Sequence, residues 1–336
     1  MNFSYDTQIA SCQKVVAELL EGVAPPSLDP SRPILFSGIG TSLHAARIAA
    51  EWVTRLSHGE MRPIPIDAHD LGTTAPIRAE DQVVVISHRG YKTFPRKALA
   101  RARSIGATTI AIVGRTAPDQ PADYTIRTCD NETAGTFSVS YLASLTVLAR
   151  MASEFETAPA RSFSHALSAL PEAIALTLSF PPPKSVIEQL ATVEVLLLVG
   201  FGIDFPTAQE AALKVKEGAW MWTEGMSPEF AIHGTPASYR PGMGCVLIEP
   251  RDDDGGRMAV LCQVMSRLGV KAIAACGERA EAEFRFVSPH PLLRPFTAIL
   301  PFHLLTAELA RLRGTDPDTL HGHRDPWKAV MTGLRL

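Results

Sequence analysis

One local pattern, a short apolar run that ends in a turn, recurs in the same order in both halves of the chain. The matched segments are 33–40 with 193–202, 83–88 with 245–250, and 108–114 with 271–277. Gly38 and Gly200 lie 162 positions apart, and Gly114 and Gly277 lie 163 apart. Three units in one order with nearly one offset indicate a tandem duplication, and any fold of this chain must accommodate it.

Helical segments separate the apolar runs. TSLHAARIAAEWVTRL follows the first run, KALARARSIG follows the second, and a long apolar helix is expected over 136–155. Residues 64–68 and 124–128 are further candidate strands. Strands that alternate with helices need crossover connections, which predicts a parallel, doubly wound sheet. We therefore expect an α/β protein with two such domains, each a mostly parallel sheet with helices on both faces in three layers.

Proline and glycine breaks set the expected boundaries. Helical spacing over 7–22 ends before Pro25-Pro26, and a helix over 163–180 ends before Pro181-Pro182-Pro183. A second long helix is expected over 297–313. The expected parts are an N-terminal helix (1–26), a first domain (27–160), a linking helix and hinge (161–183), a second domain (184–313) and a C-terminal tail (314–336).

Composition restricts the class of protein. The 336 residues are 46% hydrophobic with a net charge of −3, so no nucleic-acid or membrane partner is indicated. No apolar run approaches the ~20 residues of a membrane span, and the start MNFSYDTQIASCQ does not resemble a signal peptide. Five scattered cysteines without a CxxC pair favour buried thiols in a reducing cytoplasm. We expect a cytoplasmic protein.

Two loops follow apolar strands and are suited to an anion. Gly40, Thr41 and Ser42 open the first helix of the first domain, and the segment 87–93 reads Ser-His-Arg-Gly-Tyr-Lys-Thr. In open α/β sheets, ligands bind at the carboxyl ends of strands, near helix N-termini. Thr41 or Ser42 could equally be only a helix cap. Two such loops on one sheet edge favour binding of a single phosphate on a small molecule.

The segment EAALKVKE places Glu210, Lys214 and Glu217 on one face of a helix, at i, i+4 and i+7. The helix is expected to run on through two tryptophans to Gly225, and a short loop then ends in His233. Two carboxylates, a lysine and a histidine can together transfer protons at a carbonyl. A surface helix with a Glu–Lys pair is the alternative.

These residues resemble a known family. Gly40-Thr41-Ser42-Leu43-His44-Ala45 after a buried strand resembles the sugar isomerase (SIS) domain. The tandem arrangement, EAALKVKE and His233-Gly234 resemble the isomerase half of glutamine:fructose-6-phosphate aminotransferase. Relatives act on sugar phosphates or their amine adducts, including fructoselysine-6-phosphate deglycase-like proteins. The resemblance implies two tandem SIS domains, a sugar-phosphate substrate, a homodimer, no cofactor and no metal.

The resemblance also implies roles. Glu217 falls on the general base, Glu210 and Lys214 on the positions that support it, and His233 on the ring-opening histidine that the neighbouring subunit supplies. Lys328 is the candidate for the family's C-terminal lysine, on a tail that would close over the site. Because the charged helix belongs to the second domain and the anion loops belong to the first, we expect the site to form between the domains. The expected substrate- and phosphate-binding residues are Gly40, Thr41, Ser42, Ser87, His88, Arg89, Lys92 and Thr93.

The second anion loop departs from the family's Ser-Gln-Ser-Gly-Glu/Asp-Thr pattern. His88 and Arg89 replace Gln and Ser, Tyr91 replaces the acid, and one extra residue precedes Thr93. Cationic contacts still hold an anion, through a bidentate arginine for example. A different anion such as a carboxylate, or a substrate without phosphate, remains open. The chain begins Met1-Asn2-Phe3, so we expect no glutaminase domain and no glutamine hydrolysis.

The expected chemistry is proton transfer through an enediol or enolamine. Its outcome could be aldose–ketose isomerisation, loss or gain of ammonia at an aminosugar, or deglycation of an adduct. A non-catalytic, sugar-phosphate-binding regulatory protein is one alternative, and an isomerase repurposed for a modified or non-phosphorylated substrate is another. His321, His323 and Asp325 resemble metal ligands, but no fourth ligand lies nearby in the sequence, so we expect no metal.

Overall fold

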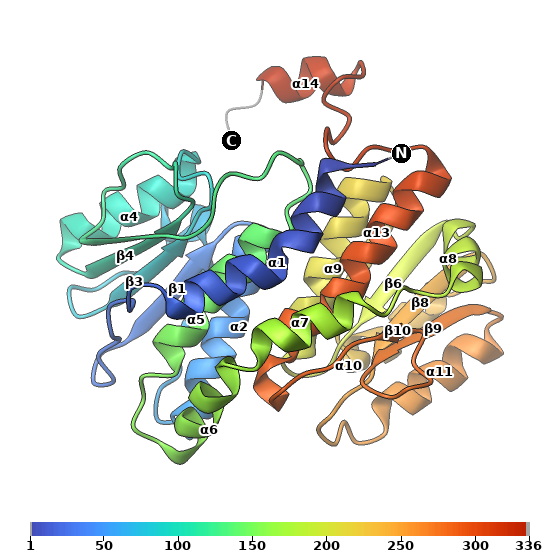
Figure 1. Cartoon of the computed structure of the whole chain (residues 1–336), viewed down its shortest axis with the longest axis horizontal. Helices are drawn as coiled ribbons and strands as arrows, with labels where there is room; N and C mark the ends of the chain where they lie inside the picture. Colours follow the sequence, from blue (N-terminus) through green and yellow to red (C-terminus); the bar gives the residue numbers. More distant parts are fainter. Residues whose placement is uncertain (1, 334–336) are drawn as a thin grey trace. The chain divides into compact units, whose positions relative to one another are not determined.

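Two parallel five-stranded β-sheets organise the computed structural model, which describes residues 2–333 (Figure 1). The chain divides into two compact units, each built on one sheet. The first unit comprises residues 11–132, 137–169 and 323–333. The second unit comprises residues 2–10, 133–136 and 170–322.

The first sheet has the strand order β2-β1-β3-β4-β5, and every neighbouring pair is parallel. Its central strands are apolar and fully buried, as expected for strands covered on both faces. Its strands are β1 (Ile34–Gly38), β2 (Ile64–Asp67), β3 (Gln82–Ile86), β4 (Thr108–Val113) and β5 (Tyr124–Arg127).

Helices cover both faces of the first sheet. Leu35, Val83 and Val85 point to the face that α3 (Ala68–Leu71) and α4 (Thr93–Ile105) cover. On the other face, α2 (Thr41–Leu56) packs against α5 (Val139–Ala152), and Trp52 of α2 contacts Phe163 of α6 (Ala158–Leu167). The remaining helices that contribute to this unit are α1 (Ser4–Glu21) and α14 (Trp327–Gly333).

The second sheet repeats the topology of the first. Its order is β10-β9-β8-β6-β7, all parallel, so both sheets read 2-1-3-4-5 when each is numbered from its own first strand. This shared order agrees with the repeat in the sequence. Its strands are β6 (Val195–Val199), β7 (Trp222–Met226), β8 (Met243–Ile248), β9 (Ala272–Gly277) and β10 (Phe284–Arg285).

The second sheet also lies between helices. Leu197, Cys245 and Leu247 pack against the side formed by α10 (Pro228–Ile232) and α11 (Arg257–Arg267). The opposite face carries the helices α8 (Lys184–Ala191), α9 (Asp204–Ala219) and α13 (Leu300–Arg313). The remaining elements of this unit are α7 (Leu170–Leu178), α12 (Arg294–Ala298) and the 3-10 helices at Thr235–Ser238 and Pro291–Leu293.

The prediction that helix α9 runs on to Gly225 is wrong. Helix α9 ends at Ala219 because Trp220 adopts a left-handed conformation with φ 51°, and the next residues form strand β7 beside β6. Gly225 does not stop a helix. Its backbone lies so close to α9 that an added Cβ would be 2.4 Å from the Gln209 Cα.

Two other predicted helices are each divided. The segment 163–180 forms parts of α6 and α7, which are separate helices. The segment 297–313 begins earlier, at Arg294, and forms α12 followed by α13. Pro301 stands in the first turn of α13, where a proline lacking an N–H ends the ladder of a preceding helix.

All five cysteines are free thiols, and four of them are buried. Across residues 2–333, none of the helices combines the length and the apolar character that a membrane crossing requires.

Candidate active site

Helix α9 carries three charged side chains on one face. The Lys214 Nζ lies 2.6 Å from a Glu217 carboxylate oxygen and 3.4 Å from a Glu210 carboxylate oxygen. Glu210 and Lys214 are fully buried, whereas the Glu217 side chain is 27% exposed. We call these three residues the α9 triad.

The burial of the triad has a physical consequence. A buried ammonium loses the hydration of water, so a protein retains one only where carboxylates compensate it. Buried, paired ionisable groups are concentrated at functional sites, although structural networks also contain them. Glu217 is the triad member that reaches solvent, so it is the one that can contact a small molecule.

A histidine and a tyrosine that the sequence analysis did not identify lie in the same unit. His303 of α13 is buried, and its Nδ1 lies 2.6 Å from the Tyr5 hydroxyl. Burial, with a smaller contribution from the positive charge of Lys214, lowers the pKa of His303 from 6.5 to about 3. His303 is therefore neutral at pH 7. The Asp318 carboxylate accepts hydrogen bonds from the backbone N–H groups of Ser4 and Tyr5, which holds Tyr5 in place.

The two predicted anion loops leave neighbouring strands of the first sheet. Strands β1 and β3 are adjacent and parallel, and the strand order reverses between them, which is where α/β sheets bind ligands. The loop after β1 turns at Gly40, with φ 55°, and α2 begins at Thr41. A Cβ on Gly38 would lie 2.5 Å from Ser42, so glycine permits this close approach of strand and helix.

The loop after β3 is held by its own contacts. Arg89 donates to the Tyr91 hydroxyl at 3.1 Å, and its guanidinium lies over the Phe137 ring at 5.1 Å from the centroid. Lys92 precedes the first residue of α4, and burial lowers its pKa. Within the described residues, the hydroxyls of Ser42 and Ser87 make no hydrogen bond, so both are available to a ligand.

His88 lies in the same loop but is buried against protein. Its ring contacts Phe137 edge-on and occupies the space beside Gly114, where an added Cβ would be 2.8 Å from the ring. Burial, with a smaller contribution from Arg89, lowers the pKa of His88 from 6.5 to about 4. His88 is therefore uncharged at pH 7, and the positive charge of this loop resides on Arg89 and Lys92.

The buried His88 predicts a loss of stability in acid. Its pKa is lower in the folded chain than in the unfolded chain, so the unfolded state takes up the proton first. Its stabilising contribution is complete above pH 6.5 and is lost as the pH falls towards 4. We expect His88 to account for about 2 kcal/mol of the stability lost between pH 7 and pH 5. Urea unfolding of His88→Phe at both pH values should lack this loss, whereas exposed His165→Phe should keep it.

Replacing Gly90 by alanine is expected to lower the stability of the chain. The φ of Gly90 is +69°, and an added Cβ would lie 2.7 Å from the Ala117 Cβ. Gly59 has a similar φ of +82° but open space around it, so it isolates the cost of the conformation alone. Gly59→Ala should cost about 1 kcal/mol, and Gly90→Ala about 2–4 kcal/mol because overpacking is added. If the two variants lost the same unfolding free energy in urea, the loop would have relaxed to accommodate the added methyl group without cost.

The other predicted site residues lie elsewhere. The His233 side chain is 77% exposed at the end of α10, with its Nε2 2.7 Å from a Glu229 carboxylate oxygen, and the α9 triad does not contact it. Lys328 is exposed in α14. The structure therefore brings Glu210, Lys214 and Glu217 together, but it does not add His233 to them.

The two tryptophans differ in their surroundings. The Trp220 ring stacks on the His321 ring, and Trp222 is 68% exposed on the edge strand β7. Among residues 2–333, no group of three or more His, Cys, Asp or Glu side chains is arranged to hold a metal ion.

Solved structures of other proteins show which fold this chain shares. The C-terminal domain of glucosamine-fructose-6-phosphate aminotransferase from Francisella tularensis superposes with a TM-score of 0.78 at 18% identity, covering 95% of this chain and 98% of that one. Tagatose-6-phosphate ketose/aldose isomerase from Escherichia coli gives 0.73 at 15% identity, covering 94% and 95%. The chain shares the α/β fold of these proteins over nearly its whole length.

Sequence comparison identifies the family of one segment of the chain. Residues 27–154 match the SIS domain model, so this segment is an SIS domain, and the predicted resemblance is confirmed for it. Glutamine–fructose-6-phosphate aminotransferase of Thermococcus kodakarensis is 27% identical over 303 residues, which is 85% of this chain and 50% of the relative. The enzyme of the same name from Methanococcus maripaludis is 31% identical over 224 residues, or 65% and 37%. The chain spans about half the length of the first curated relatives that it matches.

Proposed function

We propose that this chain catalyses proton transfer on a small sugar phosphate, an aminosugar phosphate or a glycated-amine phosphate. The observation that carries the proposal is the α9 triad, a buried lysine between two carboxylates of which only Glu217 reaches solvent. The names of the sequence relatives, which are isomerising aminotransferases of fructose 6-phosphate, support the substrate class.

In this proposal Glu217 is the general base. It removes the proton from the carbon beside the carbonyl or imine, and the electron pair forms an enediol or enolamine. As this happens, the carbonyl oxygen or imine nitrogen takes up a proton from solvent. Glu217 then returns its proton to the former carbonyl or imine carbon, while the hydroxyl on the first carbon releases a proton to solvent and becomes the new carbonyl. Lys214, 2.6 Å away, orients the Glu217 carboxylate, and Glu210 balances the buried ammonium charge. The same base serves isomerisation, deamination and deglycation.

The anionic end of the substrate would be held by the loops after β1 and β3. The unbonded hydroxyls of Ser42 and Ser87 can donate to it, and Arg89 and Lys92 supply positive charge. Gly40, Thr41 and Thr93 supply backbone at the two helix starts, where anions bind readily. Fixing the anion orients the reacting carbons and lowers the barrier by positioning.

Ring opening needs a further group. His233 would serve from the second copy of a homodimer, and its 77% exposure leaves it accessible to such a partner. Lys328 would open the ring or form and resolve an imine. Both assignments rest on the residues that match the family.

The test is deuterium exchange. The full chain is incubated in D₂O with fructose 6-phosphate, glucosamine 6-phosphate or fructoselysine 6-phosphate and followed by proton NMR. We expect loss of the proton beside the carbonyl of one of them, and the corresponding sugar without phosphate should exchange far more slowly. Ligands that raise the melting temperature but remain unexchanged over hours would instead establish the non-catalytic regulatory protein.

The loop after β3 supports a second candidate, an isomerase repurposed for a different anion. His88 is uncharged and packed away, while Arg89 is oriented by Tyr91 and Phe137. A planar guanidinium binds a carboxylate as well as a phosphate. Exchange on a sugar acid such as a ketouronate, with none on sugar phosphates, would favour this candidate.

A further inference from the structure

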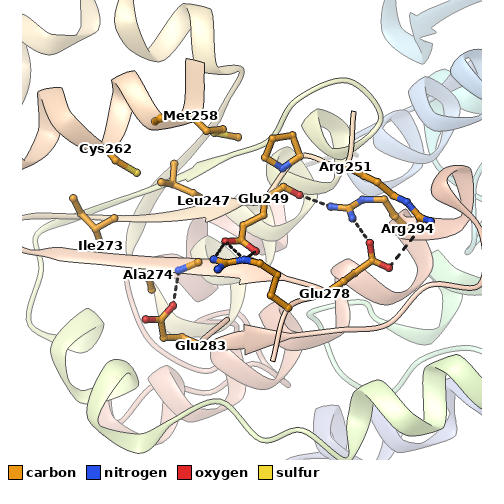
Figure 2. A pocket seen from close by; sticks show the side chains of 14 residues that line it. Leu247, Glu249, Arg251, Met258, Cys262, Ile273, Ala274, Glu278, Glu283 and Arg294 are labelled. Atoms are coloured by element: carbon orange, nitrogen blue, oxygen red, sulfur yellow. Dashed lines mark hydrogen bonds and ion pairs between the residues drawn. The ribbon is translucent and has the colours of Figure 1, made fainter. Parts of the chain in front are cut away.

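The second unit contains a cavity of about 650 Å³ at the carboxyl ends of β8 and β9, beside α11 (Figure 2). Its volume falls within the roughly 300–1,000 Å³ of small-molecule sites. Figure 2 shows apolar side chains, among them Leu247, Met258 and Ile273, at one end of the cavity. Charged side chains gather towards the other end, where Glu249, Arg251, Glu278 and Arg294 lie.

This edge differs from the corresponding edge of the first sheet. At the 162-residue offset of the repeat, Asp204 stands where the first half has Ser42, and Glu249 stands where it has Ser87. Two hydroxyls suited to an anion are thus replaced by two carboxylates. The cavity is therefore not a second phosphate site of the kind proposed for the first unit.

Arg294 is a buried residue that lines the charged end of the cavity. Its side chain is 3% exposed, and its Nε lies 3.0 and 3.2 Å from the two Asp204 carboxylate oxygens. It also donates to Glu278 at 2.6 Å and to the Glu249 carbonyl at 2.6 Å. Each nitrogen of its guanidinium is thus bonded within the protein. Arg294 therefore fixes the positions of the neighbouring side chains rather than binding a ligand.

Arg251 is different. Its side chain is 46% exposed and makes no hydrogen bond within the described residues, and the guanidinium lies 3.8 Å from a Glu278 carboxylate oxygen. Glu249 pairs with Arg279, whose side chain is 62% exposed and can swing into solvent. The cavity thus offers one arginine without a hydrogen-bonded partner and one carboxylate whose partner, Arg279, is an exposed side chain that a ligand must displace.

The side chains that line the cavity include as many carboxylates as guanidiniums, and Asp204 behind the lining pairs with Arg294. Three carboxylates (Glu249, Glu278, Glu283) face three guanidiniums (Arg251, Arg279, Arg294). A ligand of one sign would leave an uncompensated charge in a partly desolvated site, which is costly. A ligand that carries both signs adds no net charge and can satisfy an arginine and a carboxylate together.

We propose that this cavity binds a zwitterion, an α-amino acid with an apolar side chain. Its carboxylate pairs with Arg251, its ammonium pairs with Glu249 in place of Arg279, and its side chain packs on Leu247, Met258 and Ile273. This inference does not depend on the function proposed above, because it concerns a different sheet edge and different residues.

The test uses L-leucine with the full chain in isothermal titration calorimetry. We expect saturable one-to-one binding. 4-Methylpentanoate, which lacks the amine, and 3-methylbutylamine, which lacks the carboxylate, should each bind at least about tenfold more weakly, because each loses one charge-assisted contact. The proposal would be overturned if neither L-leucine nor L-methionine bound saturably. It would also be overturned if 4-methylpentanoate bound as tightly as L-leucine.

Variants locate the site. Arg251→Ala should weaken L-leucine binding by about tenfold or more, and Arg251→Lys should restore part of it. Arg240→Ala, which removes another exposed arginine that pairs with Glu194, should leave the affinity unchanged. Circular dichroism and the melting temperature verify that the variants fold. Full L-leucine affinity in folded Arg251→Ala would show that the amino acid does not bind here, which contradicts the proposal.

Discussion

Replacing Glu217 by glutamine is expected to lower kcat on the true substrate by about 10³-fold, within the 10²–10⁴ that a positioned general base contributes. Glutamine keeps the shape of the side chain and an oxygen that can accept from Lys214, but it cannot take a proton at neutral pH. KM should change little because the anion loops are untouched. The measurement is the rate of deuterium exchange and of product formation with the substrate that the NMR screen identifies.

The matched control for this variant is Glu224→Gln, an exposed carboxylate on the edge strand β7. It removes one negative charge from the same unit and should leave kcat unchanged. Unfolding midpoints of both variants should stay near that of the parent chain, because Glu217 is partly exposed. Full turnover in Glu217→Gln would remove this residue from the mechanism and would require another base.

The strands that sequence analysis placed well are those with continuous apolar runs. β1, β3 and β8 are buried along their lengths, and β6 is buried after its first residue, so alternation is absent and hydrophobicity alone marks them. Edge strand β7 reads Trp-Thr-Glu-Gly-Met and is partly exposed, and β10 has only two residues. Neither has a run of apolar residues, so only pairing with a neighbouring strand reveals it.

The predicted end of helix α9 illustrates a second limit. Helices commonly end at a glycine in the left-handed conformation, and here that position is taken by Trp220, with Gly225 five residues further on. The local pattern therefore pointed to the wrong residue. Tertiary packing, with Trp220 stacked on His321, holds a conformation that its own side chain disfavours.

The sequence could likewise indicate only part of the candidate site. The α9 triad follows from helical spacing, since i, i+4 and i+7 share a face whatever the rest of the chain does. The Tyr5–His303 pair joins residues 298 positions apart, and in the separate cavity of the second unit the Arg294–Asp204 pair joins residues 90 apart. No local period connects such residues. A histidine in the otherwise apolar run LPFHLL was the only signal that could have indicated the first pair.

Lys214→Met is expected to destabilise the chain by about 3–5 kcal/mol, the cost of removing one partner of a buried ion pair. Methionine fills a similar volume, so the loss arises from charge. Glu210 is fully buried and would keep a carboxylate whose cation, 3.4 Å away, has been removed. Urea unfolding at pH 7 measures the change. The exposed pair Lys184–Glu188, at 3.7 Å, supplies the control, and Lys184→Met should produce no measurable change.

A double variant separates charge from packing. In Lys214→Met/Glu210→Gln the remaining fully buried carboxylate becomes an uncharged amide, so we expect it to regain about half or more of the lost stability. The recovery arises because the two residues are coupled, and independent residues would instead give additive losses. Additive destabilisation would mean that Glu210 does not carry a negative charge in the folded chain. In that case the lysine would be held by Glu217 alone, and the support assigned to Glu210 would be lost.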